Sequence, residues 1–143
     1  MKIIKLRKKD KKNFIFLLNL RNKRYVRINS LDKKVISDKN HNIWLNSFFK
    51  KKDNKIFIIK KANKNIGYIR LQRKRDINVV SWALLKEYKG KKITSKALKK
   101  VTKSYKIKFV AYIKRNNFAS IKVAENAGFQ LHAKNKQLVT MNK

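Results

Sequence analysis

Residues 81–98 carry the sequence SWALLKEYKGKKITSKAL, and this stretch decides which fold the chain adopts. It begins with an apolar run typical of a β-strand, passes through a basic turn, and ends with apolar residues at helical spacing. Residues 117–129 read NFASIKVAENAGF, which predicts a loop, a short helix and a Gly-Phe entry into another strand. The two stretches predict strands and helices that alternate in one α/β layer structure.

The rest of the chain supplies the other elements of such a structure. We expect strands at 2–7, 55–60, 66–71, 77–85 and 107–113, a strand or hairpin within 129–141, and helices at 11–20, 41–49, 93–105 and 119–126. Asp38 and Asn40 are candidate N-caps for the second helix, and residues 21–27 read as a polar break. The order β-α-α-β-β-β-α-β-α-β contains no linker and no repeat, so we expect one domain over residues 1–143.

Composition excludes several classes of function. The chain has no cysteine, so disulfides and thiolate metal sites are impossible, and His41 and His132 are too few for a histidine-rich metal centre. We therefore expect no metal. No apolar run approaches the ~18 residues that a membrane-spanning helix needs. We expect a cytoplasmic or organelle-matrix protein.

The formal net charge of +34 has two interpretations. In the first, the positive charge serves to bind a polyanionic partner such as RNA, or a substrate or cofactor rich in phosphate. Drift in composition would also produce it, because only 8 of the 41 basic residues are arginine and the charge is spread along the chain. Dedicated nucleic-acid readers use arginine more heavily. We favour drift, with non-specific RNA binding as its consequence.

The stretches 81–98 and 117–129 resemble the cofactor half of the GNAT N-acetyltransferases, which move an acetyl group from acetyl-CoA to an amine. The resemblance implies acetyl-CoA as cosubstrate and the α/β GNAT fold. That fold has a mixed, mostly antiparallel sheet of about six to seven strands, flanked by about four helices and splayed between the fourth and fifth strands.

The resemblance also implies which residues hold acetyl-CoA. The family's pyrophosphate motif is Gln or Arg, two free positions, Gly, one free position, then Gly or Ala; these positions fall on Lys89, Lys92 and Thr94. Lys92 departs from the motif where a glycine would allow positive φ and close approach of phosphate. The amides of Leu84 and Leu85 would line the thioester, one of them polarising its carbonyl. The expected cofactor-binding residues are Leu84, Leu85, Lys89, Gly90, Lys91, Lys92, Ile93, Thr94, Ser95, Asn117 and Ser120.

The second stretch matches the family's Asn-x-x-Ser, Gly-Phe pattern at Asn117, Ser120, Gly128 and Phe129. Many members carry in this helix a tyrosine that protonates the departing thiolate. This chain has Ala124 there, so Tyr88, Tyr112 or a water would have to substitute, or the thiolate would leave unassisted.

The N-terminal half resembles a narrower group, the GNATs that act on nucleotide-linked amino sugars in pseudaminic acid synthesis. The likeness rests on an Arg-Asn pair, a further Arg and a His-x-x-Trp motif. It implies a small amine acceptor, with His41 as the base that deprotonates the ammonium and Leu84 beside it in catalysis. The expected substrate-binding residues are Arg21, Asn22, Arg27, Trp44 and Arg70. A structural role for His41, as a helix N-cap, stays open.

Two rival functions remain. One is a GNAT-derived basic protein that has lost catalysis and docks on RNA or the ribosome, which Lys92, Ala124 and the net charge favour. The other is acetylation of a protein N-terminus or a polyamine. A polyamine site should be acidic, and 7 acidic residues can hardly build one.

Overall fold

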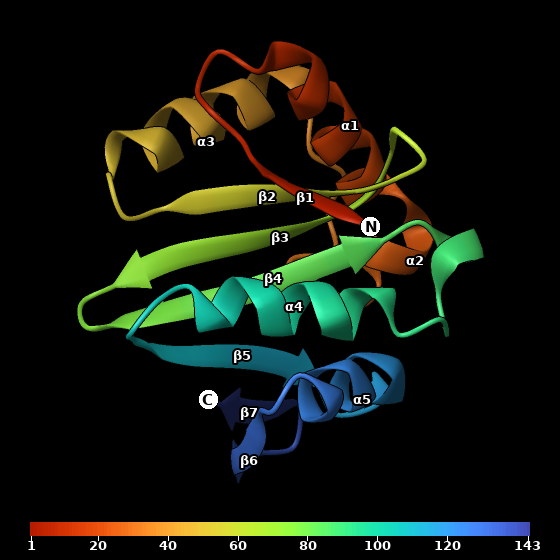
Figure 1. Ribbon diagram of the computed structural model, residues 1–143, viewed down its shortest axis with the longest axis vertical. Helices are drawn as coiled ribbons and strands as arrows, with labels where there is room; N and C mark the ends of the chain where they lie inside the picture. Colours follow the sequence, from red (N-terminus) through yellow and green to blue (C-terminus); the bar gives the residue numbers. More distant parts are fainter.

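The computed structural model describes residues Met1–Lys143 and is built on a seven-stranded sheet of order β1-β2-β3-β4-β5-β7-β6 (Figure 1). The strands are β1 Lys2–Lys5, β2 Lys55–Lys61, β3 Lys64–Lys74, β4 Ile77–Leu84, β5 Lys108–Lys114, β6 Gln130–Lys134 and β7 Leu138–Asn142. Only the β4–β5 pair is parallel; every other neighbouring pair is antiparallel. The predicted mixed, mostly antiparallel sheet is confirmed.

The helices are α1 Lys11–Asn22, α2 Arg24–Arg27, α3 Asp38–Lys50, α4 Ile93–Lys103 and α5 Phe118–Asn126, with a 3₁₀ turn, η1, at Lys86–Tyr88. Figure 1 shows α1 and α3 together at the top of the molecule, with α4 and α5 below them. Each helix group has its own apolar cluster: six buried residues under α1 and α3, and nineteen that join α4 and α5 to the sheet. The sheet thus separates two cores.

Helix α4 shows how the sequence sets the larger core. Ile93, Ala97, Leu98 and Val101 recur at helical spacing, and all four are buried, as the pattern predicts. Burying a large aliphatic side chain contributes about 1.5–3 kcal/mol, which fixes the inward face of the helix.

One local expectation was wrong, and another holds only in part. Ser37, rather than Asp38 or Asn40, caps α3, because its Oγ accepts a hydrogen bond from the Asn40 N–H at 3.1 Å. Asp38 is the first helical residue, where its charge favours the positive end of the helix dipole. The polar break expected at residues 21–27 is confined to the extended Lys23, because α1 continues through Asn22 and α2 begins at Arg24.

The predicted splay is confirmed. Strands β4 and β5 pair only where residues 77–79 face residues 108–110, and they diverge beyond Val79. At the far end of β4, Leu84 lies opposite Gly67 of β3. A Cβ on Gly67 would lie 2.6 Å from the Ala83 carbonyl oxygen, so only glycine allows this approach of the strands.

Candidate functional site

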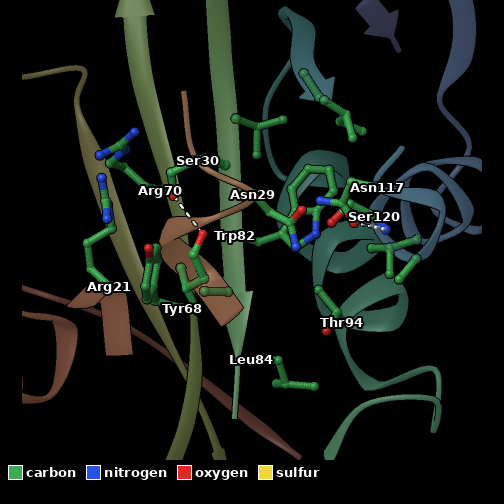
Figure 2. A pocket seen from close by; sticks show the side chains of 18 of the residues that line it. Arg21, Asn29, Ser30, Tyr68, Arg70, Trp82, Leu84, Thr94, Asn117 and Ser120 are labelled. Carbon is green, nitrogen blue, oxygen red and sulfur yellow. Dashed lines mark hydrogen bonds between the residues drawn. The ribbon is translucent and has the colours of Figure 1, made fainter. Parts of the chain in front are cut away.

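A cavity of about 800 Å³ opens where β4 and β5 diverge. Residues of α1, α2, α3 and β3 line one part of it, and residues of α4, β5 and α5 line the other. Figure 2 shows Arg21, Tyr68 and Arg70 on one side of β4, and Thr94, Asn117 and Ser120 on the other. The cavity therefore has two chemically different ends, which meet at the gap between β4 and β5. We call them the loop end (around the start of α4) and the arginine end (around Arg21 and Arg70).

The end of β4 leaves backbone groups free at the cavity. Leu85 N–H donates to the Ile66 carbonyl at 2.7 Å. Because hydrogen-bonded and non-hydrogen-bonded pairs alternate along an antiparallel ladder, Leu84 and Trp82 turn their backbone groups away from β3 and toward the gap. An extended ligand can bond there as an added strand would. The Leu85 amide is already hydrogen-bonded to Ile66, and Leu85 does not line the cavity, unlike Leu84.

The loop end presents free backbone donors to the cavity. The first hydrogen bond of α4 is from Lys96 N–H to the Lys92 carbonyl, at 3.1 Å. The N–H groups of Ile93, Thr94 and Ser95 therefore have no acceptor within the helix, and the helix dipole adds positive potential. Such a helix N-terminus can hold a phosphate.

Lys92 takes the backbone conformation that a glycine would take. Its φ is 59° and its ψ is 14°, and Gly90, two residues earlier, has a φ of 78°. A non-glycine residue in this left-handed region costs roughly 1 kcal/mol. The turn of the family motif is thus kept at Lys92, although the expected residue type is not.

Tyr25 of α2 also belongs to the site, and sequence reasoning missed it. Its hydroxyl accepts a hydrogen bond from the Lys86 N–H at 3.0 Å and donates to the Leu84 carbonyl at 3.3 Å. The Lys89 ammonium lies 4.6 Å from the centre of its ring. Burial raises the pKa of Tyr25, so the hydroxyl stays protonated. Tyr25 lies in the segment that read as a polar break, which offered no signal of a buried contact.

His41 lies in the first turn of α3, not at the N-cap, and only 6% of it is exposed. Its ring stacks on Trp44, with centroids 5.8 Å apart and planes at 20°. Burial lowers the pKa of His41, and Asp38 partly opposes that shift. The imidazole is therefore neutral near pH 7 and can accept a proton at the cavity wall.

A comparison with known protein families identifies the family of this chain. Residues 2–130 match the model of the Acetyltransferase (GNAT) domain. The chain belongs to the GNAT acetyltransferase family. No curated protein sequence matches it significantly.

Solved structures share the fold of this GNAT domain at low sequence identity. Ribosomal-protein-alanine N-acetyltransferase from Brucella melitensis has a TM-score of 0.81 at 17% identity, covering 100% of this chain and 99% of that one. Spermidine N-acetyltransferase from Vibrio cholerae, solved with CoA and spermine, has a TM-score of 0.83 at 16% identity, covering 99% and 94%. A protein from Salmonella typhimurium, solved with acetyl-CoA, has a TM-score of 0.75 at 17% identity, covering 100% and 94%.

Most of the predicted site residues of this GNAT domain lie on the cavity. They are Arg21, His41, Trp44, Arg70, Leu84, Lys89, Gly90, Lys92, Ile93, Thr94, Ser95, Asn117 and Ser120. Asn117 also caps α5, since its side-chain oxygen accepts a hydrogen bond from the Ser120 N–H at 3.2 Å. The chemical roles of these residues remain predictions. No cluster of residues suited to a metal ion occurs, and no helix is long and apolar enough to cross a membrane.

Besides Leu85, three predicted residues lie off the cavity: Asn22, Arg27 and Lys91. The Asn22 side chain bonds both backbone groups of Ile36, at 2.8 and 2.9 Å. Arg27 donates to the carbonyls of Asn22 and Lys33, at 2.9 and 3.2 Å. In this structure these two side chains hold the segment between α2 and α3 instead of facing the cavity. Lys91 is exposed, with its ammonium 5.8 Å from the centre of the Tyr88 ring.

Proposed function

We propose that this GNAT domain is an N-acetyltransferase that moves acetyl from acetyl-CoA to a primary amine, by direct transfer in a ternary complex. One observation carries the proposal: the splayed strands present the free Leu84 N–H on the cavity that also contains the open N-terminus of α4. We propose further that residues 1–143 act as one domain, because all seven strands belong to one sheet.

The loop end would hold the cosubstrate. The diphosphate of acetyl-CoA would lie on the free amides of α4, with Lys89 and Lys92 neutralising it. The pantetheine arm would run along the open edge of β4, near Asn117 and Ser120, and reach Leu84. The compared Vibrio and Salmonella structures contain CoA and acetyl-CoA, which supports this choice of cosubstrate.

The amine would attack the thioester carbonyl carbon while His41 removes its proton. The Leu84 N–H would stabilise the oxyanion that forms, and collapse of the tetrahedral intermediate would break the C–S bond. The departing thiolate then needs a proton. Ala124 has no acidic proton and is fully buried. Tyr25, Tyr88 and Tyr112, by contrast, line the cavity. The raised pKa of Tyr25 keeps a proton available there, and water is the alternative donor.

For the acceptor we propose the amine of a nucleotide-linked amino sugar. Most residues of the cavity wall are apolar, and the charged ones are basic except for Asp32, the only carboxylate on it. A polycation such as spermine, which the Vibrio structure contains, would meet like charge here. A phosphate-bearing acceptor would be attracted instead.

Calorimetry with acetyl-CoA at moderate salt tests the proposal. We expect binding in the micromolar range, abolished by neither Asn22→Ala nor Lys91→Ala, because these residues lie off the cavity. If neither heat nor a thermal shift appears at millimolar acetyl-CoA, the enzyme proposal fails.

The net charge supports a second, weaker proposal of RNA binding. Most of the lysines around the loop end are exposed and can contact phosphates without reading bases. We expect a steep salt dependence and little sequence preference. Nanomolar binding of one defined RNA at physiological salt would instead favour an RNA-docking protein over an enzyme.

A further inference from the structure

Two arginines meet at the arginine end without an anion to pair with. The Nη1 of Arg21 is buried and has no hydrogen-bond partner, while its Nη2 donates to the Asp32 backbone carbonyl at 2.6 Å. Arg70 lies over the Trp44 ring, its guanidinium carbon 5.2 Å from the ring centre. Figure 2 shows the guanidinium groups of Arg21 and Arg70 close together, with Tyr68 beside them.

Burial makes this arrangement unfavourable in the empty protein. It lowers the pKa of Arg70; Tyr68 opposes the shift, and the charge of Arg21 adds to it. The single ion pair of the chain joins Arg7 to Asp10, elsewhere on the surface, at 3.6 Å. The carboxylate of Asp32 instead accepts a hydrogen bond from the Lys34 N–H at 2.9 Å. Buried charges in proteins are normally paired, so two unpaired guanidiniums on a cavity wall call for an anion from outside.

We propose that Arg21 and Arg70 form a binding site for an oxyanion, a phosphate or a carboxylate, carried by the acetyl acceptor. The planar guanidinium fork matches both groups in geometry and charge. The Tyr68 hydroxyl stays protonated, because burial raises its pKa, and it can donate a further hydrogen bond. This inference deepens the proposed function and rests on it for the acceptor's role.

The sheet register separates the two groups that the acceptor must reach. Arg70 pairs with Ser81 on β4, and Leu84, where the amine would react, lies three residues further along that strand. The acceptor should therefore carry its oxyanion on a different part of its skeleton from the amine, as an anionic amino sugar does.

The test measures binding of three probes that share one ring: glucosamine, glucosamine 6-phosphate and 2-amino-2-deoxyglucuronate. Calorimetry is done on the full chain with CoA present, so that the loop end is occupied. Arg21→Gln and Arg70→Gln remove one guanidinium each. Arg24→Gln is the matched control, because it removes the same charge from an exposed position on α2, off the cavity. Arg70→Lys keeps the charge without the fork and covers the case in which Arg70→Gln does not fold.

We expect at least one of the anionic sugars to bind at least tenfold more tightly than glucosamine, and the better one identifies phosphate or carboxylate. Arg21→Gln and Arg70→Gln should weaken that binding at least tenfold, Arg70→Lys by less, and Arg24→Gln by less than twofold, with CoA affinity unchanged. Equal losses in Arg24→Gln and Arg70→Gln, or equal binding of all three sugars, would overturn the inference. If CoA does not bind but the arginine-dependent sugar binding persists, the proposed function fails and the oxyanion site stands.

Discussion

The two ends of the cavity both present hydrogen-bond donors without a partner, but they are built differently. At the loop end the donors are backbone amides of α4, and the lysines around them are exposed. At the arginine end the donors are side chains, held by burial, by the Trp44 ring and by the bond from Arg21 to Asp32. The loop end keeps its geometry when a side chain changes, because the backbone carries it. The arginine end depends on each residue that forms it.

This difference explains how the pyrophosphate motif can lose its glycine and keep its turn. Lys92 adopts a positive φ at a modest cost in strain, and its charge faces a site that suits anions. No comparable substitution is open at the arginine end, where a lysine would lose the bidentate fork.

The largest expected effect comes from His41→Ala, which should slow catalysis without changing the binding of acetyl-CoA at the loop end. We expect the turnover rate to fall roughly a hundredfold, because the base is lost, while acetyl-CoA affinity stays near wild type. His132→Ala is the control, since His132 is exposed on β6. Steady-state kinetics and calorimetry measure both quantities. An equal loss of acetyl-CoA affinity would show that His41 only supports the structure.

The same histidine predicts the pH dependence. Its pKa in the folded protein lies below the ordinary value of about 6.5, chiefly through burial. Below pH 6.5 the unfolded chain therefore binds more protons at His41 than the folded chain does. The contribution of His41 to the free energy of unfolding should be fully present above that pH and should fall as the pH drops below it. The wild-type transfer rate should rise with pH and level off below 6.5. His41→Ala should flatten this part of the stability profile; an unchanged profile would exclude His41 as its source.

Gly67→Ala tests the close approach of β3 and β4 beside Leu84, where the two ends of the cavity meet. The added Cβ meets the Ala83 carbonyl and the Leu84 side chain, so β4 must shift. We expect a loss of about 1–3 kcal/mol in the free energy of unfolding, together with weaker acetyl-CoA binding and slower transfer. Gly90→Ala, where nothing crowds the new Cβ, should cost only the positive φ. If Gly67→Ala melts like wild type, the close approach does not constrain Leu84.

Arg70→Met should stabilise the protein without ligand. Arg21 and Arg70 are half-buried and have no carboxylate partner. Removing one of these two charges should raise the free energy of unfolding by about 1 kcal/mol, at the expense of acceptor binding. Lys91→Met, an exposed loop position, should change stability by less than about 0.5 kcal/mol. Urea denaturation of both variants measures the contrast. Clear destabilisation by Arg70→Met would mean that its stack on Trp44 outweighs its desolvation.

Lys92→Gly should give the smallest effect. Relief of the positive φ should stabilise the protein by roughly 0.5 to 1 kcal/mol, whereas Lys92→Ala removes the charge and keeps the strain. If the Lys92 ammonium holds phosphate, Lys92→Ala should weaken CoA binding and reduce its dependence on salt. If the side chain obstructs, Lys92→Gly with Thr94→Gly should tighten it. Unchanged CoA affinity in both would place the diphosphate elsewhere.

The sequence by itself determined the order of elements, because apolar periodicity and a basic turn before a helix act between residues close in the chain. The splay of β4 from β5 and the loop end were expected from the resemblance of residues 81–98 and 117–129 to the GNAT family. The same resemblance placed Asn117 and Ser120 at the start of α5. The cap at Ser37 was missed because Asp38 and Asn40 offered equally good capping side chains nearby.

Only the tertiary structure decided the arginine end. Arg21 and Arg70 are far apart in the chain and meet because α1 packs across β3, and nothing in either local sequence shows that neither has a carboxylate partner. Tyr25 reaches Leu84 across 59 residues for the same reason. Asn22 and Arg27 resembled substrate ligands, yet they bond to nearby backbone. A residue's type indicates what it can bind, but burial and the groups packed around it decide what it does bind.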